Sequence, residues 1–285
     1  MSDAPTAEDY RSQAEALSIR RQAFIAGNYV DSANGATFDC VSPIDGAVLA
    51  PVAACDEEDV NRAVAAARKA FDDGGWSGLA PAKRKRTLKK FADLMSANRD
   101  ELALLETLDM GKPIRYSQAV DIGGAANCIA WYAEAIDKLY DEVAPTDASA
   151  LALLRREPVG VVAALVPWNF PLLITCWKLG PALAAGNSVV LKPAEQSPLT
   201  ALRIAELAAE AGIPEGVLNV VPGYGETAGQ ALGRHMDVDC VTFTGSTEVG
   251  KLFLKYSAES NMKQASLECG GKSPNIVMAD APNLD

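Results

Sequence analysis

The sequence predicts an α/β fold: a Rossmann-like parallel sheet with helices on both faces, from which one β-hairpin protrudes. Beyond Pro158, short apolar runs alternate with segments of helical periodicity, which is typical of βα units joined into a parallel sheet. Glycine and polar residues follow five successive apolar runs, as expected where ligands bind at the carboxyl ends of parallel strands. Residues 142–157 alternate with period two around a polar turn at 145–147, which predicts the hairpin.

The composition is that of a globular protein without a basic surface. Hydrophobic residues make up 49% of the 285 residues, charged residues 22%, and the formal net charge is −11. Neither a nucleic acid nor an anionic membrane is therefore an expected partner. No apolar run approaches the roughly 18 residues of a membrane span, and residues 1–10 lack the features of a signal peptide.

The cysteines and the single histidine argue against metal and disulfide chemistry. The six cysteines are widely spaced without a CxxC pair, and His235 is the one histidine. This pattern fits neither a zinc cage nor a disulfide framework. We therefore expect a cytoplasmic protein with reduced thiols and no bound metal.

The elements before and after the hairpin differ in kind. Before it we expect a mobile leader (1–20), short β-segments (24–52), three amphipathic helices opening at Asp56, after Pro81 and near Leu102, and a longer helix (117–140). After it we expect strands at 161–166, 188–191, 218–221, 239–243 and 264–268, and helices at 172–185, 198–211, 227–232 and 247–256. Candidate functional residues are therefore sought at the carboxyl ends of these five strands.

The turn at Gly245 and Ser246 is a candidate phosphate site. It follows an apolar run that ends at Phe243 and precedes a helix, so backbone N–H groups and the positive end of the helix dipole would face a ligand. The structural alternative is a plain turn in which Ser246 only caps the helix. Because the motif is neither G-x-G-x-x-G nor a Walker sequence, it favours this alternative when taken alone.

Lys192 and Glu195 are candidates for ribose binding. They stand three residues apart after a valine-rich run. A carboxylate accepts hydrogen bonds from both ribose hydroxyls, an ammonium donates to the same sugar, and the carboxylate repels a 2′-phosphate. The pair therefore favours NAD over NADP. The alternative, a solvated ion pair in a loop, is at least as well supported by these two residues alone.

Asn169 and Glu268 each lie at a strand end and carry groups that acyl chemistry uses. The amide of Asn169 can donate to an oxygen that becomes negative during reaction, and the carboxylate of Glu268 can accept a proton from water. The alternatives are an asparagine that caps the helix starting at Pro171, and a surface glutamate. In isolation, capping is the simpler interpretation of Asn169.

Five motifs together resemble the NAD-dependent aldehyde dehydrogenase superfamily, from about residue 21 to residue 285. They are PWNFP (167–171), WKLGPALAAGN (177–187), KPAE (192–195), FTGST (243–247) and LECGGK (267–272). Several long matches in the right order are specific, and they favour the functional alternative at each strand end. Residues 104–109 and 131–138 most resemble the bacterial γ-glutamyl-γ-aminobutyraldehyde dehydrogenases of putrescine catabolism, of which this chain would be the N-terminal, cofactor-binding portion only.

The resemblance implies a role for each residue of the site. Asn169 is expected to donate to the oxyanion of a thiohemiacetal, and Glu268 to activate the water that hydrolyses a thioester. The expected NAD ligands are Val166, Trp168, Lys192, Ala194, Glu195, Gly225, Gly229, Phe243, Gly245, Ser246, Val249 and Gly270. Ile174 and Trp177 are expected to line the substrate tunnel.

The resemblance also implies how the chain is divided. Residues 21–141 and 158–270 would form the NAD-binding domain, residues 142–157 an oligomerisation hairpin, and residues 271–285 the start of a catalytic domain. The hairpin carries leucines on both faces. Its edge is therefore expected to pair within a homodimer or homotetramer rather than to fold back on its own domain.

The nucleophilic cysteine is the largest departure from the family pattern. The family has it a few tens of residues beyond Lys272, and none of the six cysteines stands there. Cys269 replaces the family's usual leucine and is expected to be a buried hydrophobe, since Glu268 must face the site and strand neighbours point to opposite faces.

These features lead to two expectations about activity. The complete protein would oxidise an aldehyde, of the ω-amino or γ-glutamylamino kind, to the carboxylic acid through a cysteine thiohemiacetal and thioester. The 285 residues alone would have no turnover. The alternative is a naturally short, inactive NAD-binding module.

Overall fold

The computed structural model describes residues 6–271, 273–274 and 276–280. Within these ranges a seven-stranded sheet has the order β11-β10-β7-β8-β9-β1-β2. Its parallel strands are β7 (Val161–Leu165), β8 (Ser188–Lys192), β9 (Leu218–Val220), β10 (Cys240–Gly245) and β11 (Gln264–Cys269). The predicted α/β fold around a parallel-rich sheet is confirmed.

The sheet is not purely parallel, because two short N-terminal strands extend it. β1 (Ala23–Ile25) pairs antiparallel with β9 through Phe24 and Val220, and β2 (Asn28–Val30) pairs antiparallel with β1. Ala26 and Gly27 join the two strands with φ angles of 50° and 81°. Two successive positive φ angles match the twist of hairpin strands. The predicted β-segments therefore exist, but part of them belongs to the main sheet.

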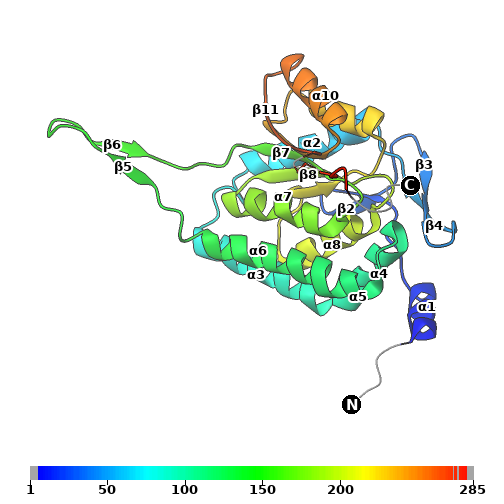
Figure 1. Cartoon of the computed structure of the whole chain (residues 1–285). Coiled ribbons are helices and arrows are strands. Elements are labelled where there is room, and N and C mark those ends of the chain that lie inside the picture. Colours follow the sequence, from blue (N-terminus) through cyan, green and yellow to red (C-terminus); the bar gives the residue numbers. More distant parts are fainter. Residues whose placement is uncertain (1–5, 272, 275, 281–285) are drawn as a thin grey trace.

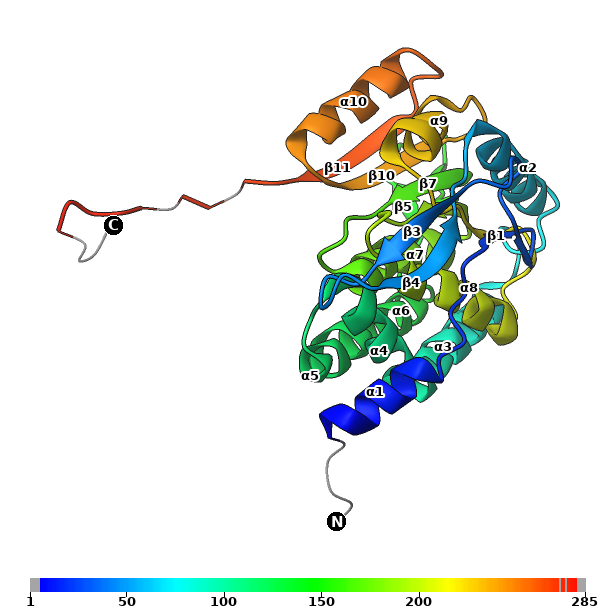
Figure 2. The same cartoon turned by 90° about the vertical axis from the view of Figure 1, so that its right-hand side faces the viewer.

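Helices cover both faces of this sheet (Figure 1, Figure 2). One face carries α3 (Pro81–Ala97), α4 (Arg99–Met110), α6 (Gly123–Ala135), α7 (Pro171–Ala185) and α8 (Leu199–Ala211), and the other carries α2 (Glu57–Asp72), α9 (Gln230–Arg234) and α10 (Thr247–Ala258). The strands separate two hydrophobic cores, because successive side chains point to opposite faces. On β7, Val162 and Ala164 lie in the first core, whereas Val161 and Ala163 lie in the second.

Several helix boundaries differ from the prediction. Asp56 caps α2 as expected, and Gly111 ends α4 in the left-handed conformation. The expected single helix 117–140 is wrong: α5 (Ile114–Tyr116) and a π-helix, η1 (Ser117–Ile122), precede α6, which ends at Ala135. A second π-helix, η2 (Gly225–Gly229), likewise precedes α9. Glycines lie beside or within both π segments, where their low helix propensity lowers the cost of widening the turn.

The expected leader contains a helix, α1 (Ala7–Glu15), that the sequence analysis did not include. Thr6 and Asp9 form a capping box at its start, which explains why a helix begins here. None of its residues is buried. Residues 1–5 of the leader lie outside the described part of the chain.

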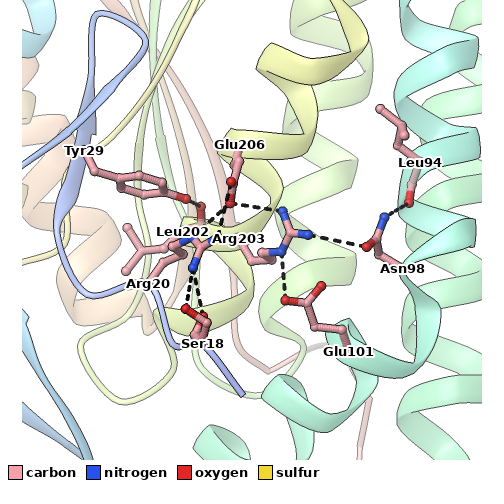
Figure 3. Close-up of polar contacts among 9 residues, drawn as sticks. All are labelled: Ser18, Arg20, Tyr29, Leu94, Asn98, Glu101, Leu202, Arg203 and Glu206. Carbon is pink, nitrogen blue, oxygen red and sulfur yellow. Dashed lines mark hydrogen bonds and ion pairs between the residues drawn. The ribbon is translucent and has the colours of Figure 1, made fainter. Parts of the chain in front are cut away.

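An ion-pair network fixes the segment after α1 to the body (Figure 3). Arg20 donates to Glu206 of α8 at 2.9 and 3.2 Å, and Arg203 donates to Glu206 at 3.1 Å and to Glu101 of α4 at 2.9 Å. The hydroxyl of Tyr29 donates to the Leu202 carbonyl at 2.8 Å. Burial raises the pKa of Tyr29 to about 12, so the hydroxyl stays a donor. This network also holds α4 against α8.

Two further antiparallel pairs complete the described elements. β3 (Thr37–Val41) pairs with β4 (Val48–Ala53). β5 (Glu142–Ala144) pairs with β6 (Ala152–Leu154), and Figure 1 shows this hairpin projecting away from the body. The predicted protruding hairpin is therefore present, although its strands are shorter than residues 142–157 allow. Among the described helices, none has the length and apolar character needed to cross a membrane.

Candidate active site

A cleft of about 350 Å³ opens at the carboxyl ends of β7, β10 and β11. Pro167, Trp168, Asn169, Ile174, Thr244, Gly245, Ser246, Glu268, Cys269 and Gly270 line it. Seven of these residues were predicted to belong to the site; Pro167, Thr244 and Cys269 were not. The cleft thus brings together residues that are up to about 100 positions apart, because the parallel strands end at the same edge of the sheet.

The turn at Gly245 and Ser246 has the geometry expected for an anion site. β10 ends at Gly245, and the Ser246 hydroxyl caps α10 by accepting from the Val249 N–H at 3.2 Å. A Cβ atom on Gly245 would lie 2.5 Å from Cζ of Phe243, so a larger residue would clash with that ring. Ser246 therefore caps α10, as the alternative of a plain turn with a capping serine predicted. The start of the twelve-residue α10 nevertheless borders the cleft and directs its dipole there.

Lys192 and Glu195 do form an ion pair, but it is not a solvated one. Lys192 Nζ lies 3.2 Å from Glu195 Oε2 and 2.9 Å from the Pro193 carbonyl oxygen. The lysine is 5% exposed, and burial lowers its pKa although the charge of Glu195 opposes that shift. Glu195 is only partly buried, so one carboxylate face stays accessible to a ligand.

The remaining predicted NAD ligands surround these two centres. Gly229 lies beside Lys192, since a Cβ atom there would be 3.8 Å from Lys192 Cδ. Gly225 begins η2 with no atom within 4 Å of a Cβ position. Val166, Ala194 and Phe243 are buried, and Val249 is partly exposed in the first turn of α10. Whether each of them touches a cofactor stays a prediction.

Asn169 is not a helix cap, so the capping alternative is wrong. The N-cap of α7 is Phe170, which has no side-chain hydrogen bond to the helix, and the helix starts at Pro171. Asn169 is exposed and lines the cleft. Its amide is therefore available to donate to a bound ligand.

Lys178 of α7 is a candidate functional residue that the sequence analysis missed. Its side chain is nearly buried, and Nζ donates to Thr242 Oγ1 at 2.9 Å. Burial lowers the pKa of Lys178 to about 8, while the negative charge of nearby Glu268 favours the ammonium form. A lysine within the apolar helix 172–185 was the available signal.

Cys269 and Trp177 complete the comparison with the prediction. Cys269 was expected to be a buried hydrophobe facing away from the site, and this is only partly right: it packs against the second core but is partly exposed and borders the cleft. It is the last residue of β11. Trp177 is 56% exposed and lies one helical turn beyond Ile174, which lines the cleft. Their tunnel role stays a prediction.

A larger cleft of about 890 Å³ lies between the start of α2 and α9. Acidic and polar side chains dominate its lining, among them Asp56, Glu57, Glu58 and Glu226. None of the predicted site residues lines it. The chemistry-bearing residues therefore point to the smaller cleft at the strand ends.

The sheet and its helices define an α/β fold of the Rossmann-like class, in which a helix start, an amide and a carboxylate share one strand edge. The sequence profile of the aldehyde dehydrogenase family matches residues 29–285. The chain belongs to this family.

Individual relatives are similar over nearly the whole chain. The NADP/NAD-dependent aldehyde dehydrogenase PuuC of Escherichia coli is 60% identical over 275 residues, which are 96% of this chain and 56% of PuuC. The indole-3-acetaldehyde dehydrogenase AldA of P. syringae, solved with NAD+ and IAA, is 64% identical with a TM-score of 0.95, over 98% of this chain and 57% of AldA. The γ-glutamyl-γ-aminobutyraldehyde dehydrogenase of Burkholderia cenocepacia is 62% identical with a TM-score of 0.94, over 98% and 56%. The chain thus spans little more than half the length of these relatives.

Proposed function

We propose that this chain is the NAD-binding portion of an NAD-dependent aldehyde dehydrogenase, and that the complete enzyme oxidises an ω-amino or γ-glutamylamino aldehyde to its acid. One observation carries the proposal: a single cleft joins the start of α10, the amide of Asn169 and the carboxylate of Glu268. The names of PuuC and of the Burkholderia cenocepacia enzyme support the cofactor and the substrate class.

The cleft and the loop of Lys192 and Glu195 outside its lining together fit a dinucleotide. Gly245 has no side chain, which lets the Phe243 ring pack against the turn, and the N–H groups at the start of α10 beside the cleft are donors that a pyrophosphate would accept from. Glu195 and Lys192 offer a ribose an acceptor and a donor side by side. When bound, NAD supplies the hydride acceptor of the reaction.

Asn169 and Glu268 would act on the acyl centre. Asn169 donates to the oxygen that becomes negative when a thiolate adds to the aldehyde carbonyl. The thiohemiacetal becomes a thioester when its carbon gives up a hydride, for which NAD would be the acceptor. Glu268 accepts a proton from the water that then cleaves the thioester, which yields the acid and restores the thiol. The negative charge of Glu268 favours the ammonium form of Lys178, so the two side chains interact electrostatically at this edge of the sheet.

We predict that a homogeneous 285-residue chain has no aldehyde turnover. Burial raises the pKa of five of the six thiols, Cys40, Cys55, Cys128, Cys176 and Cys240, which keeps them protonated. Cys269 borders the cleft but follows directly after the proposed base. The measurement is NADH production from a short aldehyde by protein of verified mass, with NAD binding as the control for folding. Steady turnover that is lost in Cys269→Ala would show that the nucleophile has been misplaced.

We predict that Glu195→Ala weakens NAD binding by about tenfold and relaxes discrimination against NADP. The substitution removes a charge-assisted acceptor for the ribose hydroxyls and the repulsion of a 2′-phosphate. Titration of the 285-residue chain with each dinucleotide measures both effects. Glu210→Ala, at an exposed residue in the last turn of α8 that lines neither cleft, is the matched control. Unchanged NAD affinity in Glu195→Ala would remove Glu195 from the site.

The complete enzyme is proposed to be a cytoplasmic homodimer or homotetramer that pairs through the hairpin. The wide spacing of the six cysteines, without a CxxC pair, supports a reducing compartment. Val143, Leu151, Leu153 and Leu154 of the hairpin are all at least half exposed, and the hairpin does not fold back on its own body. An apolar ribbon of two strands is marginal in water, so a second copy would cover it.

Hydrogen exchange of residues 142–157 tests this assembly. In a verified monomer of the 285-residue chain, we expect these amides to exchange about as fast as an unfolded peptide. In the complete oligomer we expect the same amides to be protected by at least tenfold. The buried strand β7 provides the internal control in both samples. Slow exchange throughout the hairpin of a monomer would contradict the proposed role.

A further inference from the structure

Two buried carboxyl groups of α4 contact the starts of two other helices. Glu106 Oε2 accepts from the backbone N–H of Leu172 at 3.3 Å, and Asp109 Oδ2 accepts from that of Leu199 at 2.9 Å. The exposed fractions of Glu106 and Asp109 are 0% and 2%. Since the two residues are three positions apart on one helix, they share a face and reach α7 and α8 together.

Neither α7 nor α8 has a cap from its own sequence. Their N-cap residues, Phe170 and Pro198, make no side-chain hydrogen bond to the helix. The first N–H groups of a helix have no partner within the helix and need one from outside. The carboxyl groups of Glu106 and Asp109 therefore cap the starts of α7 and α8, although they come from a different helix.

These two helix starts carry the two halves of the candidate site. Asn169 directly precedes the N-cap of α7, and the loop with Lys192 and Glu195 leads into α8. The two segments also touch, because Ser197 Oγ donates to the Trp168 carbonyl at 3.4 Å. A shift of α4 would thus move both the amide and the ribose-binding pair.

Contacts at both ends hold α4 in place. At its start, Glu101 accepts from Arg203 of α8, and Asn98 accepts from the same guanidinium at 3.4 Å (Figure 3). Just beyond its end, Lys112 pairs with buried Asp121 at 2.7 Å and lies 3.9 Å from the ring centroid of Phe170. The helix that supplies both caps is therefore fixed relative to α8 and to the turn before α7.

We propose that Glu106 and Asp109 are positioning residues for separate halves of the site: Glu106 holds the turn that bears Asn169, and Asp109 holds the loop that bears Lys192 and Glu195. Their effect on catalysis rests on the proposed function, whereas their effect on the two helix starts does not. Burial and the charge of Asp121 raise the pKa of Glu106 to about 8, and burial raises that of Asp109 well above its usual range. Both shifts favour the neutral form of the carboxyl group, so the neutral amides of glutamine and asparagine are the matched replacements.

Hydrogen exchange in the 285-residue chain tests the positioning directly. Glu106→Asp and Asp109→Ser shorten the side chains while keeping them polar. We expect Glu106→Asp to accelerate exchange of Leu172 by roughly five- to tenfold with Leu199 unchanged, and Asp109→Ser to do the reverse. In the Glu106→Gln and Asp109→Asn variants, the amides of Leu172 and Leu199 should both exchange at the wild-type rate. Asp100→Asn, at an exposed residue of the same helix, is the control.

Kinetics of the complete enzyme test the consequence. Glu106→Asp should lower kcat about tenfold with NAD affinity unchanged, whereas Asp109→Ser should weaken NAD binding about tenfold. Equal acceleration of exchange at both helix starts in either variant, or no acceleration in both, would overturn the inference. A wild-type enzyme without aldehyde oxidation would instead refute the proposed function, and the exchange result would still decide between the two positioning roles and a merely structural one.

Discussion

Replacing Glu268 by glutamine in the complete enzyme is expected to abolish steady aldehyde oxidation while a first burst of NADH survives. Glutamine keeps the size and hydrogen bonding of the side chain but accepts no proton. Hydride transfer precedes thioester hydrolysis, so one equivalent of NADH per active site should form as the acyl-enzyme accumulates. Loss of a general base lowers the hydrolysis rate by about 100- to 10,000-fold.

Stopped-flow absorbance of NADH separates the two phases. Glu210→Gln, at an exposed residue in the last turn of α8 that does not line the cleft, is the matched control and should keep both the burst and the steady rate. Wild-type steady turnover in Glu268→Gln would exclude Glu268 as the base. Loss of the burst together with the steady phase would place its role in the first half of the reaction.

Asn169→Ala is expected to lower kcat of the complete enzyme by about 100- to 1,000-fold, the range found when one oxyanion donor is removed. Both phases should slow in this variant, because the same oxygen becomes negative in thiohemiacetal formation and in thioester hydrolysis. The affinity for NAD should change by less than about threefold, since other residues make the proposed contacts: Lys192 and Glu195, which lie outside the cleft lining, for the ribose, and the start of α10 for the pyrophosphate. The stability of the protein should also be nearly unchanged, because Asn169 caps no helix.

Thermal unfolding and NAD titration of the same preparation control for misfolding. Asn169→Asp, which keeps the size and removes the donor, should be at least as impaired as Asn169→Ala. A variant whose kcat stays within about threefold of wild type would show that Asn169 does not stabilise the oxyanion.

The cleft could be predicted from the sequence because its residues lie immediately after apolar strands. Asn169, Gly245 and Glu268 each follow or end such a run, and parallel strands bring their carboxyl ends to one edge whatever the details of the loops. The position in the chain was enough to place these residues near one another. The sequence could not decide between a functional and a purely structural role for each residue. For Asn169, the capping role was excluded only when the structure showed which residue is the N-cap of α7.

Other features depend on partners that are distant in sequence. Glu106 and Leu172 are 66 positions apart, and Asp109 and Leu199 are 90 apart, so no local pattern links them. The pairing of Phe24 with Val220, which joins β1 to the main sheet, was not predicted because these residues are also distant in sequence. The sequence analysis missed the π segments because a widened helical turn leaves the helical spacing of apolar residues nearly unchanged. The nearby glycines were the available signal.

The two cores on either side of the sheet have a consequence for how substitutions combine. Val190 and Leu191 are neighbours in β8, yet Val190 lies in the second core and Leu191 in the first. Changes in free energy of unfolding add when two residues share no packing partners, and they interact when residues are in contact. Adjacent positions of β7 and β8 are therefore close to independent in their effects, whereas residues far apart in sequence within one core are coupled. For this domain, epistasis follows the face of the sheet rather than the distance along the chain.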